Sequence, residues 1–87
     1  MSKTLTKGDV VIEDIQIGDI HYEYDLGFCI KSRVLTVPQL DDDGLWSWKS
    51  INLFSNRIIH YAQSVDVPAY LGLNLYTTEA YMGCKFI

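Results

Sequence analysis

Short runs in which apolar and polar residues alternate, each bounded by turn residues, constrain the fold of this sequence more than any other feature. In residues 20–25, the apolar or aromatic Ile20, Tyr22 and Tyr24 alternate with polar side chains. Successive side chains of a strand point to opposite faces, so one apolar face indicates a strand that is buried on one side. We expect the face with the two tyrosines to pack against the core, with their hydroxyl groups at its rim.

Other segments also have the composition or the alternation of strands, and turn residues separate them. Pro38 ends a strand because it lacks an amide donor, while Gly44 and Asn56 tolerate the left-handed backbone of loops and tight hairpins. Thr77 or Thr78 is a candidate N-cap for a short helical turn. The sequence thus predicts strands within residues 9–17, 17–27, 28–37, 45–54, 57–62 and 84–87.

These segments predict a mainly β protein. We expect one small antiparallel sheet of four to five strands, curled into a partly open, SH3-like barrel, with at most one short C-terminal helical turn. Small sheets curl because a flat sheet leaves long unpaired edges. A five-stranded OB-like barrel is the nearest alternative. A length of 87 residues predicts a single domain, 1–87.

Composition limits the classes of partner. A net charge of −4 disfavours nucleic acid, which proteins attract through basic surfaces. No apolar run is long enough to span a membrane, and no secretion signal is recognisable, so we expect a cytoplasmic protein with Cys29 and Cys84 reduced. Hydrophobic residues are 48% of the chain and aromatic residues 13%. A core this small cannot bury so much aromatic surface, which predicts contact with another chain.

Four motifs follow one another within residues 15–82: IGDIHYEY, IKSRV, GLWSWKSI and NLYTTEAY. In this order they resemble a broad group of small accessory proteins of phages and bacteria. The resemblance implies an SH3-like barrel, a viral source and therefore the cytosol of a host cell. It also implies inhibition of a host factor, although the group has no single activity. Gly83 and Cys84 depart from the pattern, because they shorten the terminal helix of the group.

Motifs of catalysis and of metal binding are missing from the sequence. It contains no G-x-S-x-G, no phosphate-binding glycine loop and no H-E-x-x-H. The spacing of His21, Cys29, His60 and Cys84 resembles no zinc module, and the three aspartates at 41–43 lack the ligand spacing of a calcium loop. We therefore expect no enzymatic activity, no cofactor and no metal.

Two tryptophans stand two positions apart, so Trp46 and Trp48 share one face of the strand predicted at 45–54. Leu45, Ile51 and Leu53 lie on the other face. Whichever face packs on the core, the other leaves a large apolar surface outside, unless a bulge shifts the alternation. Exposed indoles would suit either a protein partner or the face of a nucleobase.

The leading hypothesis is a non-enzymatic binding protein that inhibits a host defence or regulatory factor by occupying its surface. Such a protein would also self-associate, most simply as a two-fold dimer. Tryptophan and tyrosine supply much of the binding energy at protein interfaces. The predicted partner-binding residues are Trp46, Trp48, Tyr70 and Tyr76, with the loop 65–76 as part of the contact face.

Two alternatives remain open. The first is a homo-oligomer that sequesters an anionic, cyclic nucleotide, in which aromatic rings stack on the base and cations hold the phosphate. Its predicted ligand-binding residues are Lys31, Arg33, Lys49, Arg57, Trp48 and Tyr61. The second is a minor component of a virion or of its assembly.

Overall fold

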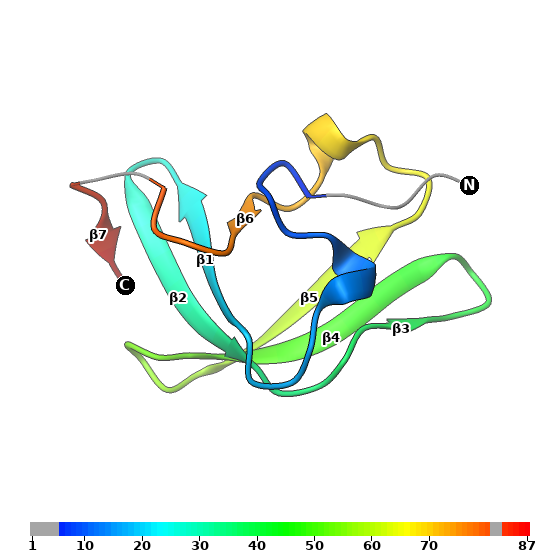
Figure 1. The fold of residues 1–87 in the computed structure, drawn as a ribbon, viewed down its shortest axis with the longest axis horizontal. Coiled ribbons are helices and arrows are strands. Elements are labelled where there is room, and N and C mark those ends of the chain that lie inside the picture. Colours follow the sequence, from blue (N-terminus) through cyan, green and yellow to red (C-terminus); the bar gives the residue numbers. More distant parts are fainter. Residues whose placement is uncertain (1–5, 81–82) are drawn as a thin grey trace.

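The computed structural model describes residues 6–80 and 83–87, and four strands dominate it. They are β1 (Ile20–Asp25), β2 (Phe28–Val34), β4 (Leu45–Asn52) and β5 (Ile58–Ser64). The strands β1 and β2 form one arm, β4 and β5 form the other, and the N-terminal segment lies between the arms (Figure 1). The protein is therefore mainly β, and its sheet is partly open, as predicted.

Three strands of two residues extend this sheet: β3 (Gln39–Leu40), β6 (Leu75–Tyr76) and β7 (Lys85–Phe86). The described strands follow the order β3-β4-β2-β1-β6, with β5 paired to the other edge of β4 and β7 paired to β2. The β2–β7 pair is parallel, and the other pairs are antiparallel. The short strand predicted at 84–87 is confirmed as β7.

Local turn chemistry sets the two long hairpins. Between β1 and β2, Leu26 and Gly27 have φ angles of 47° and 86°, which suits the two-residue turn that matches strand twist. Between β4 and β5, Asn56 has a φ of 61°. The Asn52 side chain accepts hydrogen bonds from the amides of Phe54 (2.8 Å) and Ser55 (3.2 Å). The turn between the strands predicted at 17–27 and 28–37 is confirmed. The left-handed backbone of Asn56 is confirmed too, but the loop between β4 and β5 spans residues 53–57 and is longer than the predicted tight hairpin.

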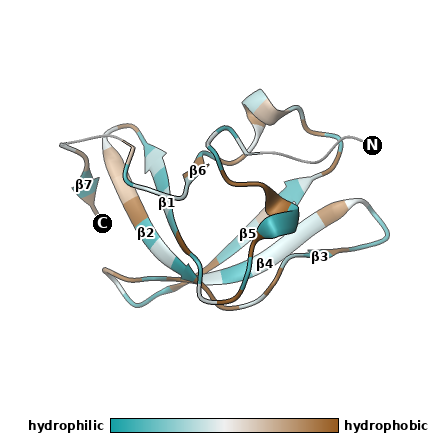
Figure 2. Cartoon of the chain, in the orientation of Figure 1, coloured by the Kyte–Doolittle hydropathy of each residue, from teal (hydrophilic) through white to brown (hydrophobic). Residues whose placement is uncertain are grey.

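The hydrophobic core lies between the two arms. The N-terminal segment is held there by backbone hydrogen bonds from Lys7 to Leu73 (2.6 Å) and from Val10 to Leu75 (3.4 Å). Hydrophobic residues lead into η1 (Ile12–Asp14), a 3-10 helix in which Ile12 is buried and the two acidic residues are exposed, and the ribbon changes there from brown to teal (Figure 2). The buried core residues are Val10, Ile12, Ile15, Val34, Trp48, Tyr61 and Leu75.

The strand predicted at 9–17 is wrong, because this segment contains η1 instead. Val10, Ile12 and Ile15 are all buried in the core. In a strand, Val10 and Ile12 would share a face while Ile15 would point the opposite way. The helical turn between Ile12 and Ile15 brings all three side chains to the core, so tertiary packing overrides the β propensity of valine and isoleucine.

The prediction for the tyrosine face of β1 is confirmed for Tyr24, which is buried, whereas Tyr22 on the same face is only half-buried. His21 is buried on the opposite face, and Glu23, on that same face, accepts a hydrogen bond from Tyr61 in the core (2.9 Å). Tyr24 is buried too, but against the C-terminal segment, where the Ala80 amide donates to its hydroxyl (2.6 Å). Both faces of β1 are therefore covered, although by different parts of the chain.

The C-terminal segment forms no helix over residues 77–80, and residues 81–82 lie outside the description, so a helical turn at Thr77 or Thr78 is not seen in the described part. Instead, the backbone amide and the hydroxyl of Thr77 both donate to Asp9 (2.7 and 2.9 Å). The other helical turn described is η2 (Ala69–Leu71). Neither of these turns approaches the length of a membrane-spanning helix.

Candidate functional site

The two tryptophans face the interior of the protein. Trp48 is only 3% exposed, and its ring stacks on that of Tyr61 with the centroids 5.4 Å apart and the planes 22° from parallel. Trp46 is half-buried and packs against the core. The expected contact between Trp48 and a partner is therefore corrected: the indole stabilises the fold, and almost none of it can touch another molecule.

The alternation of β4 explains this placement. Trp46, Trp48, Ser50 and Asn52 share the inner face of the strand, while Leu45, Ser47, Lys49 and Ile51 share its outer face. Of the two arrangements that the sequence left open, the structure has the one with aliphatic residues outside. We use the term outer face for the side of β4 and β5 that points away from the core.

The other predicted partner-binding residues do not join the tryptophans in one surface. Tyr70 is 73% exposed and lies in η2. Tyr76 is half-buried in β6, where its ring meets Tyr24 edge to face at 5.5 Å. The single aromatic contact face predicted from Trp46, Trp48, Tyr70 and Tyr76 is therefore not present in this arrangement.

The four cations predicted to bind a nucleotide do not lie together either. Lys31 lies over the ring of Tyr22, with its Nζ 5.7 Å from the ring centroid, and borders a hollow with Phe54, Phe86, Leu53 and Glu79. Lys49 borders a different hollow. Arg33 and Arg57 are exposed and line neither. The rings of Trp48 and Tyr61 are buried against each other, so they are not available to stack on a nucleobase.

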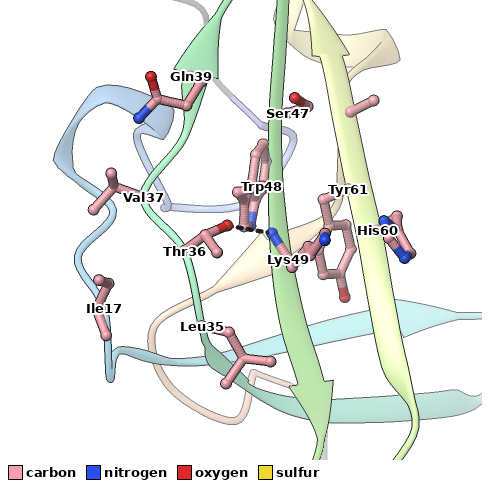
Figure 3. Close-up of a pocket in the computed structure, with 11 residues that line it drawn as sticks. Ile17, Leu35, Thr36, Val37, Gln39, Ser47, Trp48, Lys49, His60 and Tyr61 are labelled. Carbon is pink, nitrogen blue, oxygen red and sulfur yellow. Dashed lines mark hydrogen bonds between the residues drawn. The ribbon is translucent and has the colours of Figure 1, made fainter.

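The hollow beside Lys49 is an open depression of about 530 Å³ on the outer face, which we call the outer depression. Figure 3 shows Leu35, Thr36 and Val37 on one side of β4 and His60 on the other. The residues that line it are Ile17, Leu35, Thr36, Val37, Gln39, Ser47, Trp48, Lys49, His60, Tyr61 and Ala62. Because the rings of Trp48 and Tyr61 are buried, these two residues form its floor rather than a contact surface.

Backbone hydrogen bonds hold the apolar wall of the outer depression in place. The amides of Leu35 (2.8 Å) and Thr36 (3.2 Å) both donate to the carbonyl of Lys49, and the Thr36 hydroxyl accepts from the Lys49 amide (2.9 Å). The side chains of Leu35, Val37 and Ile17 nevertheless remain exposed, Ile17 by 66%. The wall is thus an apolar surface that the described chain leaves partly open to solvent.

The outer depression carries a positive charge, because Lys49 is among the residues that line it. Lys49 projects from β4, and its register partner His60 projects from β5. No carboxylate is among the residues that line the depression, although the whole chain has a net charge of −4. The site therefore combines aliphatic side chains with a local positive charge.

Sequence reasoning misses Ile17, Leu35, Val37 and His60 as site residues. One signal was present, because the alternation of residues 31–37 continues beyond the end of β2. On the outer side of that run, the cations Lys31 and Arg33 give way to the apolar Leu35 and Val37. These positions before Pro38 therefore indicate an exposed apolar surface.

The side chains that could bind a metal are dispersed in the described part of the chain. Among residues 6–80 and 83–87, no three side chains of histidine, cysteine, aspartate or glutamate are placed to hold an ion together. Cys29 is buried, and burial raises the pKa of its thiol, so this cysteine is held in the protonated form.

Two groups that can release a proton, the half-buried Glu23 and the buried Tyr61, are hydrogen-bonded to each other on the inner side of the sheet. The Tyr61 hydroxyl donates to Glu23 at 2.9 Å. Burial raises the pKa of the Glu23 carboxyl, an effect that this hydrogen bond partly opposes, and burial together with Glu23 raises the pKa of Tyr61. Both groups therefore favour their protonated forms more in the folded than in the unfolded chain.

Replacement of Glu23 with glutamine is expected to change how stability depends on pH. A carboxyl whose pKa is raised by folding stabilises the fold below its ordinary value of 4.5, and this contribution is lost as the pH rises through the raised value. Relative to the wild type, E23Q should therefore gain stability from pH 4.5 to neutral pH, measured by urea unfolding. Glu13→Gln, at an exposed residue of η1, is the matched control, and an equal gain there would contradict this account.

Comparison with known proteins gives no family and no relative. No family model matches the sequence, and neither the curated proteins nor the solved structures contain a significant match.

Proposed function

We propose that this chain is a non-enzymatic binding protein, and that it binds another protein at the outer depression. The observation that supports this proposal is the exposed wall of Ile17, Leu35 and Val37 beside Lys49. Thirteen large hydrophobic side chains of the described residues are exposed, and these three border one hollow. Contiguous apolar surface on a small protein is typical of an interaction site.

The chemistry of the outer depression defines the kind of partner. Aliphatic walls favour an aliphatic or aromatic side chain, which would lose its contact with water on binding. Lys49 and the absence of a lining carboxylate favour a partner with an acidic residue beside that apolar side chain. The expected ligand is therefore a protein surface that presents an apolar side chain next to aspartate or glutamate.

A protein suits this site better than an anionic nucleotide. A nucleotide site needs an exposed ring for the base and several cations for the phosphate. The rings of Trp48 and Tyr61 are covered, and Lys49 and Lys31 border different hollows. In the setting implied by the sequence resemblance, the bound protein is a host defence or regulatory factor, and occupancy of its surface inhibits it.

The test is retention of a partner by immobilised protein in host lysate. Replacement of Val37 with glutamate would place a carboxylate in the apolar wall, and an at least about tenfold loss of retained partner is expected, since the charge must be desolvated on binding. Leu26→Glu is the matched control, because Leu26 is 92% exposed at the β1–β2 turn and lines no part of the depression.

Two outcomes would contradict the proposal. In the first, the wild type retains no protein above the level of an unrelated control. In the second, L26E and V37E reduce retention equally, which would place the contact outside the outer depression.

A further inference from the structure

The strand β5 has one edge without a strand partner in the described chain. It pairs with β4 through all seven of its residues, Ile58 to Ser64. No further backbone hydrogen bond from residues 6–80 or 83–87 reaches positions 58–63. Figure 3 shows β5 beside β4, with its other edge turned away from the rest of the sheet.

The register identifies which residues present their backbone groups at this free edge. The Asn52 amide donates to the Arg57 carbonyl at 2.8 Å, so Arg57 bonds toward β4. In an antiparallel pair, alternate residues bond to the same neighbour, so Ile59, Tyr61 and Gln63 also bond toward β4. Ile58, His60 and Ala62 therefore direct their amides and carbonyls to the free edge.

Features that normally protect a free edge are missing from β5. Edge strands are usually blocked by lysine, by proline, by a bulge or by short length. The segment IIHYAQS contains no proline, lysine or acidic residue, and its pairing with β4 is continuous over seven residues. Ile58 is also 49% exposed. Such an edge is a template for one more strand.

We propose that the free edge of β5 pairs antiparallel with β5 of a second copy of this chain, about a two-fold axis at His60. His60 then faces His60 of the second copy, and Ile58 faces Ala62 of the second copy. At each of these three pairs the two residues exchange both backbone hydrogen bonds. The edge is self-complementary, because the large Ile58 meets the small Ala62 and β5 itself contains no lysine, arginine or carboxylate.

This dimer would have a consequence for the outer face. The side chains of His60 and Ala62 border the outer depression, so the depressions of both copies would form one continuous surface across the axis. The two copies of β4, each of which carries Lys49, would lie three strand spacings apart, about 14 Å. The dimer does not depend on the proposed partner, since its interface is the backbone edge.

Cysteine cross-linking tests the register. Residues in a hydrogen-bonded antiparallel pair have Cα atoms about 5.5 Å apart, within the range of about 4.4–6.8 Å that a disulfide spans. His60→Cys, in a Cys84→Ser background that leaves only the buried Cys29, should therefore form a covalent dimer in a glutathione redox buffer. Ile58→Cys is the matched control, because in this register the two copies of residue 58 lie about 14 Å apart. At least about tenfold more dimer is expected from H60C than from I58C.

Sedimentation velocity of the unmodified protein over a range of concentrations supplies a second readout, with circular dichroism to confirm that each variant is folded. A mass of two chains together with preferential H60C cross-linking supports the proposal. A folded wild type that remains monomeric at all concentrations overturns it, and would leave the edge to a strand of another protein. Equal cross-linking of H60C and I58C would overturn the register.

Discussion

Trp48→Ala is expected to lower the free energy of unfolding by about 3–5 kcal/mol, the usual cost of truncating a buried tryptophan. Trp48 is 3% exposed and belongs to the core cluster that joins the N-terminal segment, β4, β5 and β6. Its loss would leave a cavity and remove the stacking partner of Tyr61. Because a domain of this size is stable by about 5–15 kcal/mol, a large part of its stability would be lost.

Urea unfolding followed by far-ultraviolet circular dichroism would measure this loss. Trp46→Ala is the matched control, since the same side chain is removed from the same face of β4 at a half-buried position. A clearly smaller loss is expected for W46A. If the two variants lost equal stability, the assignment of Trp48 to the core and of Trp46 to its margin would be incorrect.

This difference between the tryptophans shows what alternation can and cannot predict. The period of two placed Trp46 and Trp48 on one face of a strand, and the structure confirms this. It did not determine which face is inside, because both faces of β4 carry apolar residues. The answer depends on the N-terminal segment, whose Val10, Ile12 and Ile15 cover the tryptophan face.

The difference between local interactions and contacts across the sequence also explains which other elements could be predicted. The hairpin at Leu26–Gly27 and the left-handed Asn56 were predictable, because a left-handed backbone is a local property of a few residues. The helical turn η1 was not predictable, because it depends on contacts between segments more than fifty residues apart, such as Val10 with Leu75. Both faces of β1 are covered because segments distant in the sequence pack on them, at Tyr61 and at Ala80.

The outer depression was beyond prediction for a further reason. Its apolar wall joins Ile17, which precedes β1, to Leu35 and Val37, which follow β2, and His60 comes from β5. Alternation indicates that a side chain faces outward, but it does not indicate which outward side chains become neighbours. Only the curl of the sheet brings these residues around one hollow, with Lys49 at its side.

Gly8 lies where the N-terminal segment crosses β6, and its replacement tests how that segment holds the fold together. A Cβ atom at position 8 would overlap the carbonyl oxygen of Leu75. This oxygen accepts hydrogen bonds from the Val10 amide (3.4 Å) and the Thr6 hydroxyl (3.4 Å), so it cannot move aside without losing both. The glycine is therefore required by close backbone contact rather than by a left-handed backbone.

Gly8→Ala is accordingly expected to destabilise the protein by about 3 kcal/mol, the upper range for steric overpacking. Displacement of the segment would also loosen Val10, Ile12 and Ile15 from the core. Gly27→Ala is the control: no atom lies within 4 Å of its added Cβ, and its φ of 86° predicts a cost of only about 1–2 kcal/mol. Urea unfolding of the two variants side by side distinguishes the cases. A G8A protein as stable as G27A would mean that the N-terminal segment does not pack against β6 as closely as the structure shows.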